Sequence, residues 1–149
     1  MTHAEKALQY FTDGANCAQA VVLAFHDTLG MDEKTASRLA SSFGGGIGRL
    51  REVCGAVSGM MMVYGLLKGY DDLHDPELKK AHYANVQALA AKFREENGSI
   101  ICRDILSLRR DENNDATPTP RDAQFFHSRP CLNCVASAAR ILDEALKKE

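Results

Sequence analysis

Five cysteines in a chain of 149 residues are the side chains best suited to chemistry: Cys17, Cys54, Cys102, Cys131 and Cys134. A domain of this length buries about 68–70% of its unfolded surface and does not need disulfides in order to fold. The polar N-terminus lacks the apolar run of a secretory signal, so we expect a cytoplasmic protein. In that reducing compartment, clustered cysteines are more often catalytic or metal-binding than structural.

Each cysteine is predicted to lie in the first turn of a helix. Cys17 follows the capping residue Asn16, and Cys54 follows a run of glycines. Cys131 opens the last predicted helix, with Cys134 three residues later. The free amide protons and the positive end of the helix dipole favour an anion there, which lowers a thiol pKa. Since the thiolate attacks disulfides and binds metals, these positions predict a reactive thiol site.

The same positions also fit small residues of a hydrophobic core. Free cysteine is among the most buried residue types, and both Cys17 and Cys131 lie on apolar stripes of their predicted helices. The Cys131-x-x-Cys134 spacing resembles a redox dithiol pair, but no βαβ unit of the thioredoxin type is predicted around it. A metal held by this pair would need two further ligands, which the other cysteines could supply.

Two groups of glycines are candidate contacts for a ligand. Gly45 and Gly46 belong to a glycine run before a helix, where free amides could hydrogen-bond a thiolate, sulfide or a small anion. The run follows a predicted helix rather than a strand and lacks the Lys-Ser/Thr of a P-loop, which argues against nucleotide binding. Gly55 and Gly59 lie on one helical face and predict close approach of a backbone or a ligand. Three arginines could add positive charge near the thiols: Arg49, Arg51 and Arg103.

The remaining residues divide into helix-length segments without a convincing alternating strand. We predict an all-α single domain over residues 1–149, a bundle of about seven helices around a central apolar helix at about 53–67. As a helix, those fifteen residues would extend about 22 Å, short of the roughly 30 Å of a bilayer core, so membrane insertion is not expected. Asp32 and Ser99 are further predicted caps, and residues 109–130 are predicted to be a long irregular loop. The other predicted helices are 3–12, 16–29, 32–42, 76–97, 100–108 and 132–147.

The charge balance excludes a strongly basic or acidic partner surface. The chain carries 18 Lys and Arg against 20 Asp and Glu, a formal net charge of −2. Nucleic-acid binding draws on a clear local excess of positive charge, so it is not expected. Homodimerisation is an expectation common to small helical domains.

The motifs together resemble the C_GCAxxG_C_C family, small bacterial and archaeal proteins described as redox-active. The resemblance covers about residues 7–146 and implies a helical domain with four hallmark cysteines, often encoded near transporter genes. At Cys134 the resemblance implies an apolar residue instead, which leaves the role of this cysteine open. The matching segments are residues 16–20, 43–49, 53–59 with the Cys-Gly-Ala-x-x-Gly core, and 99–103; the hallmark cysteines are Cys17, Cys54, Cys102 and Cys131.

The leading hypothesis is a thiol redox protein, an oxidoreductase in which these four cysteines converge. They would cycle between dithiol and disulfide, with Cys54 as the attacking thiolate and a protein or small molecule as redox partner. Alternatively, the four thiolates would hold zinc or an iron–sulfur cluster. The rival hypothesis is a non-catalytic helical binding module, associated with a transporter, whose cysteines are structural or regulatory.

Overall fold

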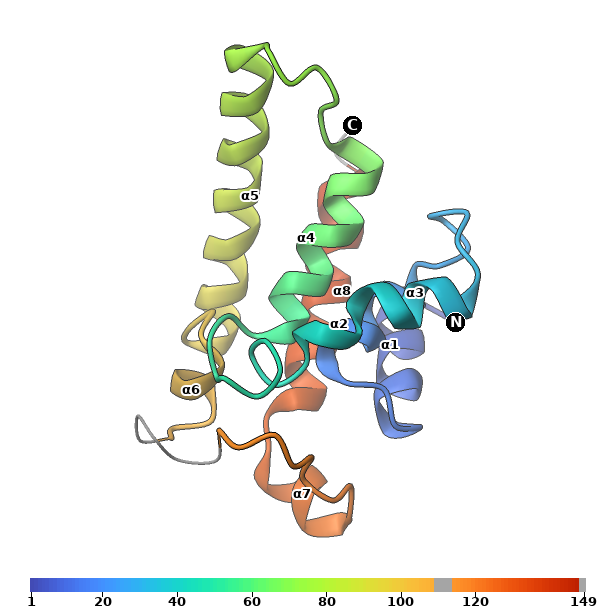
Figure 1. Ribbon diagram of the computed structural model, residues 1–149, viewed down its shortest axis with the longest axis vertical. Helices are drawn as coiled ribbons and strands as arrows, with labels where there is room; N and C mark the ends of the chain where they lie inside the picture. Colours follow the sequence, from blue (N-terminus) through green and yellow to red (C-terminus); the bar gives the residue numbers. More distant parts are fainter. Residues whose placement is uncertain (109–113, 148–149) are drawn as a thin grey trace.

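The computed structural model describes residues 1–108 and 114–147, which form helices and turns with no β-strand among them. The all-α prediction is therefore confirmed, and Figure 1 shows how the helices are arranged. Residues 41–43 form a short 3-10 turn after the third helix. The described helices are α1 (His3–Thr12), α2 (Cys17–Ala24), α3 (Glu33–Ala40), α4 (Gly55–Lys68), α5 (Pro76–Asn97), α6 (Cys102–Ile105), α7 (Ala123–Ser128) and α8 (Cys131–Lys147).

Side chains cap the starts of α2 and α5. The side chain of Asn16 accepts a hydrogen bond from the Gln19 amide at 2.9 Å, and the Gln19 side chain accepts one from the Asn16 amide at 3.0 Å. This reciprocal pair is a capping box on α2. Asp75 accepts two amide hydrogen bonds at the start of α5, where Pro76 takes the first position. Gly98, with φ of 87°, ends α5 in the left-handed conformation that glycine adopts without strain.

Helices α2, α4 and α8 share the interior of the bundle. α2 packs against α1, α3, α4 and α8, and most of its side chains are buried. α4 packs against α2 and α8, and the long α5 runs alongside it (Figure 1). A Cβ at Gly59 of α4 would lie 2.8 Å from the carbonyl oxygen of Ala18, so glycine allows the backbones of α2 and α4 to approach closely. Among the described helices, none is long and apolar enough to cross a membrane.

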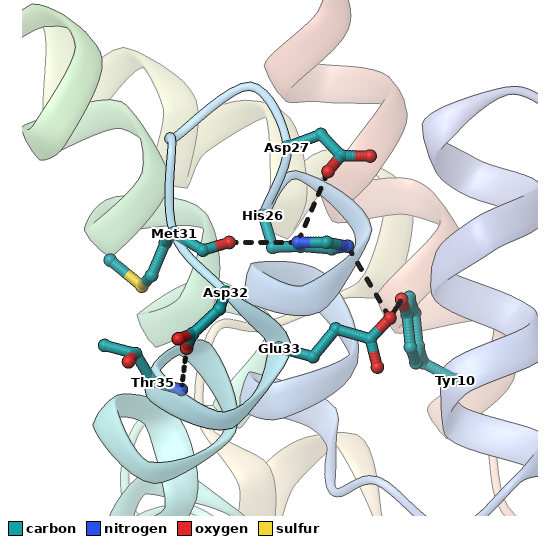
Figure 2. A network of polar contacts seen from close by, with 7 residues as sticks. All are labelled: Tyr10, His26, Asp27, Met31, Asp32, Glu33 and Thr35. Carbon is teal, nitrogen blue, oxygen red and sulfur yellow. Dashed lines mark hydrogen bonds and ion pairs between the residues drawn. The ribbon is translucent and has the colours of Figure 1, made fainter.

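The second helix is shorter than predicted. The sequence predicts a helix as far as Leu29, whereas α2 ends at Ala24 and the chain turns. The ring of His26 holds this turn: its Nδ1 lies 2.9 Å from the carbonyl oxygen of Met31, and its Nε2 lies 3.8 Å from Oε1 of Glu33. Figure 2 shows the ring between these two partners. The contacts stabilise a tight connection to α3 in place of another helical turn.

The sixth helix is shorter than the predicted range 100–108 at both ends. Ile101 forms an isolated antiparallel bridge with Val53, so α6 begins at Cys102 with Ile101, rather than the predicted Ser99, as its N-cap. It ends at Ile105, before the turn in which Ser107 has φ of 57°. The same bridge moves the start of α4 from about residue 53 to Gly55.

Part of the segment predicted as an irregular loop over 109–130 is helical. Asp122 caps α7 by accepting a hydrogen bond from the Phe125 amide at 2.9 Å. Phe125 then packs on Phe11 of α1, with ring centroids 6.1 Å apart. The six residues of α7 are too few to show a helical period, which is why the sequence analysis missed it. Residues 109–113 lie outside the described residues, which contain eight helices, in agreement with the predicted bundle of about seven.

Candidate functional site

All five cysteines line one cavity of about 420 Å³. Cys17, Cys102 and Cys131 are the first residues of α2, α6 and α8. Cys54 is the N-cap of α4, and Cys134 lies one turn into α8. In Figure 1, α4 and α8 both begin in the lower half of the bundle and run upward. The predicted placement of the cysteines at helix starts is confirmed, and those starts converge on a single cavity.

A short backbone pairing brings Cys54 and Cys102 to the same wall of the cavity. The amide of Cys54 donates a hydrogen bond to the carbonyl oxygen of Ile100 at 2.8 Å, and the amide of Cys102 donates one to the carbonyl oxygen of Glu52 at 2.7 Å. These bonds flank the bridge described above. The pairing is too short to leave an alternating pattern in the sequence, so it could not be predicted.

Four of the thiols interact in two pairs, and all five cysteines are free thiols. Cys17 at the start of α2 pairs with Cys131, and Cys54 at the start of α4 pairs with Cys134. Residues three apart on a helix face the same side, so α8 supplies one thiol to each pair. Cys134 is 1% exposed and belongs to the cluster. The Cys-x-x-Cys spacing was the sequence signal for its role.

The pair nearer to solvent is strongly polarised. The thiol of Cys17 donates a hydrogen bond to the sulfur of Cys131, which with the positive charge of Arg129, Arg121 and Arg51 lowers the pKa of Cys131 to about 7 although burial opposes this. Donating that hydrogen bond and being buried raise the pKa of Cys17 well above its usual range. At neutral pH about half of Cys131 is therefore thiolate, whereas Cys17 is a neutral thiol.

The deeper pair has the same arrangement. The hydrogen bond from Cys134 lowers the pKa of Cys54, and the amides of Ala56 and Val57 at the start of α4 add to this effect against the cost of burial. The interaction with Cys54 and burial raise the pKa of Cys134, whose Sγ lies 3.8 Å from Oδ1 of Asn97. Cys54 thus has the thiolate character expected at a helix N-terminus.

The fifth cysteine, Cys102, interacts with an arginine instead of a thiol. Nη1 of Arg51 lies 3.6 Å from Sγ of Cys102, and the Arg51 side chain is 3% exposed. Burial raises the pKa of Cys102, and the hydrogen bond from Arg51 opposes the rise. The expectation that every helix-start cysteine has a lowered pKa is therefore wrong for Cys17, Cys102 and Cys134. Burial and hydrogen-bond donation outweigh the helix terminus at these positions.

The glycine run forms a left-handed loop at the cavity. Gly45 and Gly46 have φ of 65° and 72° and line the cavity, and Ile47 continues the left-handed run with φ of 69°. A Cβ at Gly46 would lie 2.6 Å from the amide nitrogen of Glu52, so the chain folds back tightly on itself. The loop brings the residues just before Cys54 to the cavity wall.

The two glycines of α4 have different surroundings. Gly55 lines the cavity, and a Cβ there would lie 3.1 Å from Cβ of Cys17 and 3.0 Å from the Ala18 amide nitrogen. Gly59 faces the backbone of α2 one turn further along and is not among the residues that line the cavity. Of the two explanations that the sequence left open for Gly59, the structure shows the close approach of a backbone.

Arginines surround the thiols on several sides. Arg49 and Arg51, both predicted to lie near the cysteines, line the cavity. Arg103, also expected there, lies outside the lining and donates to the carbonyl oxygen of Leu50 at 3.4 Å. Two further lining arginines, Arg121 and Arg129, come from the α7 segment and were missed. They lie in the segment that was predicted to be an irregular loop, so they were not predicted to lie near the thiols.

The arrangement of donors does not fit a resident metal. Across residues 1–108 and 114–147, no three Cys, His, Asp or Glu side chains are gathered so that they could hold one ion. The four cysteines predicted as a ligand set are split between partners, because Cys17 pairs with Cys131 whereas Cys54 pairs with Cys134. Tetrahedral zinc or iron requires four donors around one point.

Comparison with known proteins identifies one family. A family model described as "Putative redox-active protein (C_GCAxxG_C_C)" matches residues 15–145, which is most of the chain. No curated protein and no solved structure matches the chain.

Proposed function

The chain belongs to the C_GCAxxG_C_C family, and from that premise we propose that it is a thiol–disulfide oxidoreductase of the cytoplasm in which Cys131 and Cys17 carry the exchange. The observation that carries this proposal is the polarised pair at the cavity. Cys131 has a pKa of about 7, a donor thiol beside it and three arginines around it. Its side chain is only partly buried, whereas Cys54 is 5% exposed. We therefore assign the attacking role to Cys131 rather than to Cys54.

The exchange proceeds in two balanced steps. The thiolate of Cys131 attacks one sulfur of a substrate disulfide, forming a mixed disulfide and releasing one substrate thiolate, which takes a proton from water. Cys17 then loses its proton to solvent and attacks the Cys131 sulfur, which releases the second substrate thiol. The substrate gains two electrons, and the protein holds a Cys17–Cys131 disulfide. A cellular thiol or dithiol reductant restores the starting state by the reverse exchange.

The buried pair is positioned to accept the disulfide from the outer pair. Cys134 lies three residues from Cys131 on the same face of α8, so once its proton has passed to the Cys54 thiolate it attacks Cys131 in the Cys17–Cys131 disulfide and releases Cys17 as a thiolate. The Cys17 thiolate then takes that proton from Cys54 by way of solvent. Cys54 then attacks Cys134 and releases Cys131, which gives a Cys54–Cys134 disulfide and returns the outer pair to the dithiol form. No electrons are gained or lost in this transfer. In a Cys131→Ser variant, mild oxidant should leave Cys54 and Cys134 reduced, as mass spectrometry of alkylated peptides would show.

The matched variants Cys17→Ser and Cys131→Ser test the exchange, both in a Cys134→Ser background that removes the second thiol able to attack Cys131. With bis(2-hydroxyethyl) disulfide, Cys17→Ser should accumulate the mixed disulfide on Cys131, seen as a mass increase, because the resolving thiol is absent. Cys131→Ser should form far less adduct under the same conditions. Equal adduct formation in both variants, each with wild-type circular dichroism, would show that Cys131 is not the attacking thiol.

Metal content separates dithiol chemistry from the metal-binding hypothesis. Anaerobically purified wild-type protein should titrate five free thiols under denaturing conditions and contain no stoichiometric zinc or iron. A stoichiometric metal that is lost in the Cys131→Ser variant would overturn the dithiol proposal. Absence of both metal and adducts would instead favour a binding module.

A further inference from the structure

We propose that the arginines of the cavity form a carboxylate-binding subsite, and that the disulfide exchanged by the protein is a small molecule carrying carboxylate groups. The identity of the substrate rests on the proposed exchange function. The subsite itself is independent of that function, because it binds carboxylates whether or not a disulfide reacts.

The described lining of the cavity contains several arginines but no carboxylate side chain. Four arginines line it, and none of the described lining residues is Asp or Glu. The chain as a whole is slightly acidic, with a formal net charge of −2, so the arginines are a local feature. The four are Arg49, Arg51, Arg121 and Arg129.

Arg121 is held by uncharged hydrogen-bond partners, which do not neutralise its positive charge. Its Nη1 donates to the carbonyl oxygen of Phe11 at 2.9 Å, and its Nη2 donates to the carbonyl oxygen of Ala15 at 3.0 Å. The guanidinium also lies over the rings of Phe11 and Phe125, at 4.2 and 4.8 Å from their centroids. A guanidinium has five N–H donors, so further donors are left for a ligand. Burial lowers the pKa of Arg121, which is the cost that a bound anion would offset.

Arg129 adds a second guanidinium on the same side of the cavity. Its Nη2 lies 3.4 Å from Oγ1 of Thr119, and its guanidinium carbon lies 5.2 Å from the ring centroid of Phe125. Among the described residues, neither Arg121 nor Arg129 forms an ion pair with a carboxylate. Two guanidinium groups whose described partners are neutral can bind a carboxylate through paired N–H groups.

The thiolate of Cys131 neutralises part of the positive charge of the arginines, and the remaining positive charge can bind an anionic ligand. Arg129 and Arg121 both lower the pKa of Cys131, so they lie near the sulfur that reacts. A single thiolate faces several guanidinium groups, and its negative charge is lost when Cys131 forms a disulfide. A carboxylate held by these arginines would bring the sulfur of the same small molecule to Cys131. The cavity volume of about 420 Å³ falls in the range of about 300–1,000 Å³ typical of small-molecule sites.

Binding of adipate tests the subsite without any redox step. Adipate has the length and charge of dithiodiglycolate, with a CH₂–CH₂ unit in place of the disulfide, and adipamide is its neutral counterpart. By calorimetry with the reduced wild-type protein, adipate should bind saturably and adipamide about tenfold more weakly or worse, the loss expected for one charged hydrogen-bonding group. Equal binding of the two, or no binding of adipate, would overturn the subsite.

A set of arginine variants localises the binding. Arg129→Gln should weaken adipate binding by about tenfold, and Arg129→Lys should recover part of the loss because it keeps the charge. Arg140→Gln is the matched control, since Arg140 lies on the exposed side of α8 with Glu96 at 3.7 Å and does not line the cavity. An equal loss in Arg129→Gln and Arg140→Gln would show that general charge, rather than a site, attracts the anion.

The substrate class is tested with three disulfides of different charge. The probes are dithiodiglycolate, bis(2-hydroxyethyl) disulfide and cystamine, which are anionic, neutral and cationic. Each rate is divided by the rate with free 2-mercaptoethanol, which removes intrinsic reactivity. Normalised kcat/KM should be highest for the anion and lowest for the cation, and the preference should shrink in Arg129→Gln and at high salt. Equal normalised values with intact exchange would refute the substrate class alone, whereas adipate binding without any exchange would refute the proposed function alone.

Discussion

Removing the Cys17 thiol should raise the pKa of Cys131. The hydrogen bond from Cys17 is the largest contribution to a Cys131 pKa of about 7. A hydrogen bond to a charged group contributes about 1.5–3 kcal/mol, and one pKa unit corresponds to about 1.4 kcal/mol. The bond is therefore worth about 1–2 pKa units, and we expect a pKa of about 8–9 for Cys131 in a Cys17→Ala variant.

The pH dependence of alkylation measures this pKa directly. The reduced protein is treated with iodoacetamide between pH 5 and 10, and the modified peptide containing Cys131 is quantified by mass spectrometry. At pH 7 a rise in pKa from about 7 to about 8.5 reduces the thiolate fraction by about 15-fold. The more basic thiolate is also more nucleophilic, with a Brønsted coefficient of about 0.4–0.5, which offsets part of that loss. The midpoint of the profile, rather than one rate, is therefore the quantity to compare.

Two results decide between the thiol and the arginines as the cause of the lowered pKa. Cys102→Ala removes a different buried thiol of the cavity and keeps the Cys17 hydrogen bond, so we expect its Cys131 midpoint to stay close to that of the wild type. If Cys17→Ala also keeps the wild-type midpoint while its circular dichroism is unchanged, the hydrogen bond does not set the pKa. The surrounding arginines would then account for the thiolate.

Three further predictions concern stability and are checked by urea unfolding of the reduced protein. Because the folded-state pKa of Cys131 is lowered to about 7, unfolding takes up a proton between that value and the usual thiol pKa of about 8.5, so the free energy of unfolding should rise with pH across this window. The rise should be smaller in Cys131→Ser, and an identical profile would contradict the assignment. Gly59→Ala should lower the free energy of unfolding by about 1–3 kcal/mol, since its Cβ would lie 2.8 Å from the Ala18 carbonyl oxygen; a neutral result would mean that α2 and α4 separate easily. Ile47→Gly should leave stability unchanged or raise it by up to about 1 kcal/mol, because relief of left-handed strain exceeds the entropy cost of glycine; a clear loss would show that the Ile47 side chain stabilises the loop.

Helix starts could be predicted from the sequence because their signals are local. Asn16, Asp32 and Asp75 each accept amide hydrogen bonds within the next three residues, and such contacts depend on neighbouring side chains alone. The same local signals allowed the cysteines to be predicted at helix starts. The end of α2 could not be predicted in this way, because it depends on contacts of His26 with Met31 and Glu33 across a turn.

The pairing of the thiols could not be predicted because it depends on how the helices pack. Cys131 and Cys134 share one face of α8, yet each contacts the start of a different helix. Sequence spacing shows that the two lie together but not which partner each one finds. The resemblance to a four-cysteine family pointed away from Cys134, whereas burial against Cys54 brings it into the cluster.

The loop before α4 points to a chemical role for the cavity independently of the cysteines. Ile47, Arg49 and Arg51 adopt φ of 69°, 69° and 63°, a conformation that costs about 1–2 kcal/mol for each residue other than glycine. A helical bundle can connect two helices without this strain. The strained backbone does, however, place the buried guanidinium of Arg51 beside the sulfur of Cys102. Strain of this kind persists where surrounding structure holds it, most often at functional sites, so the loop favours the proposed functional role of the cavity.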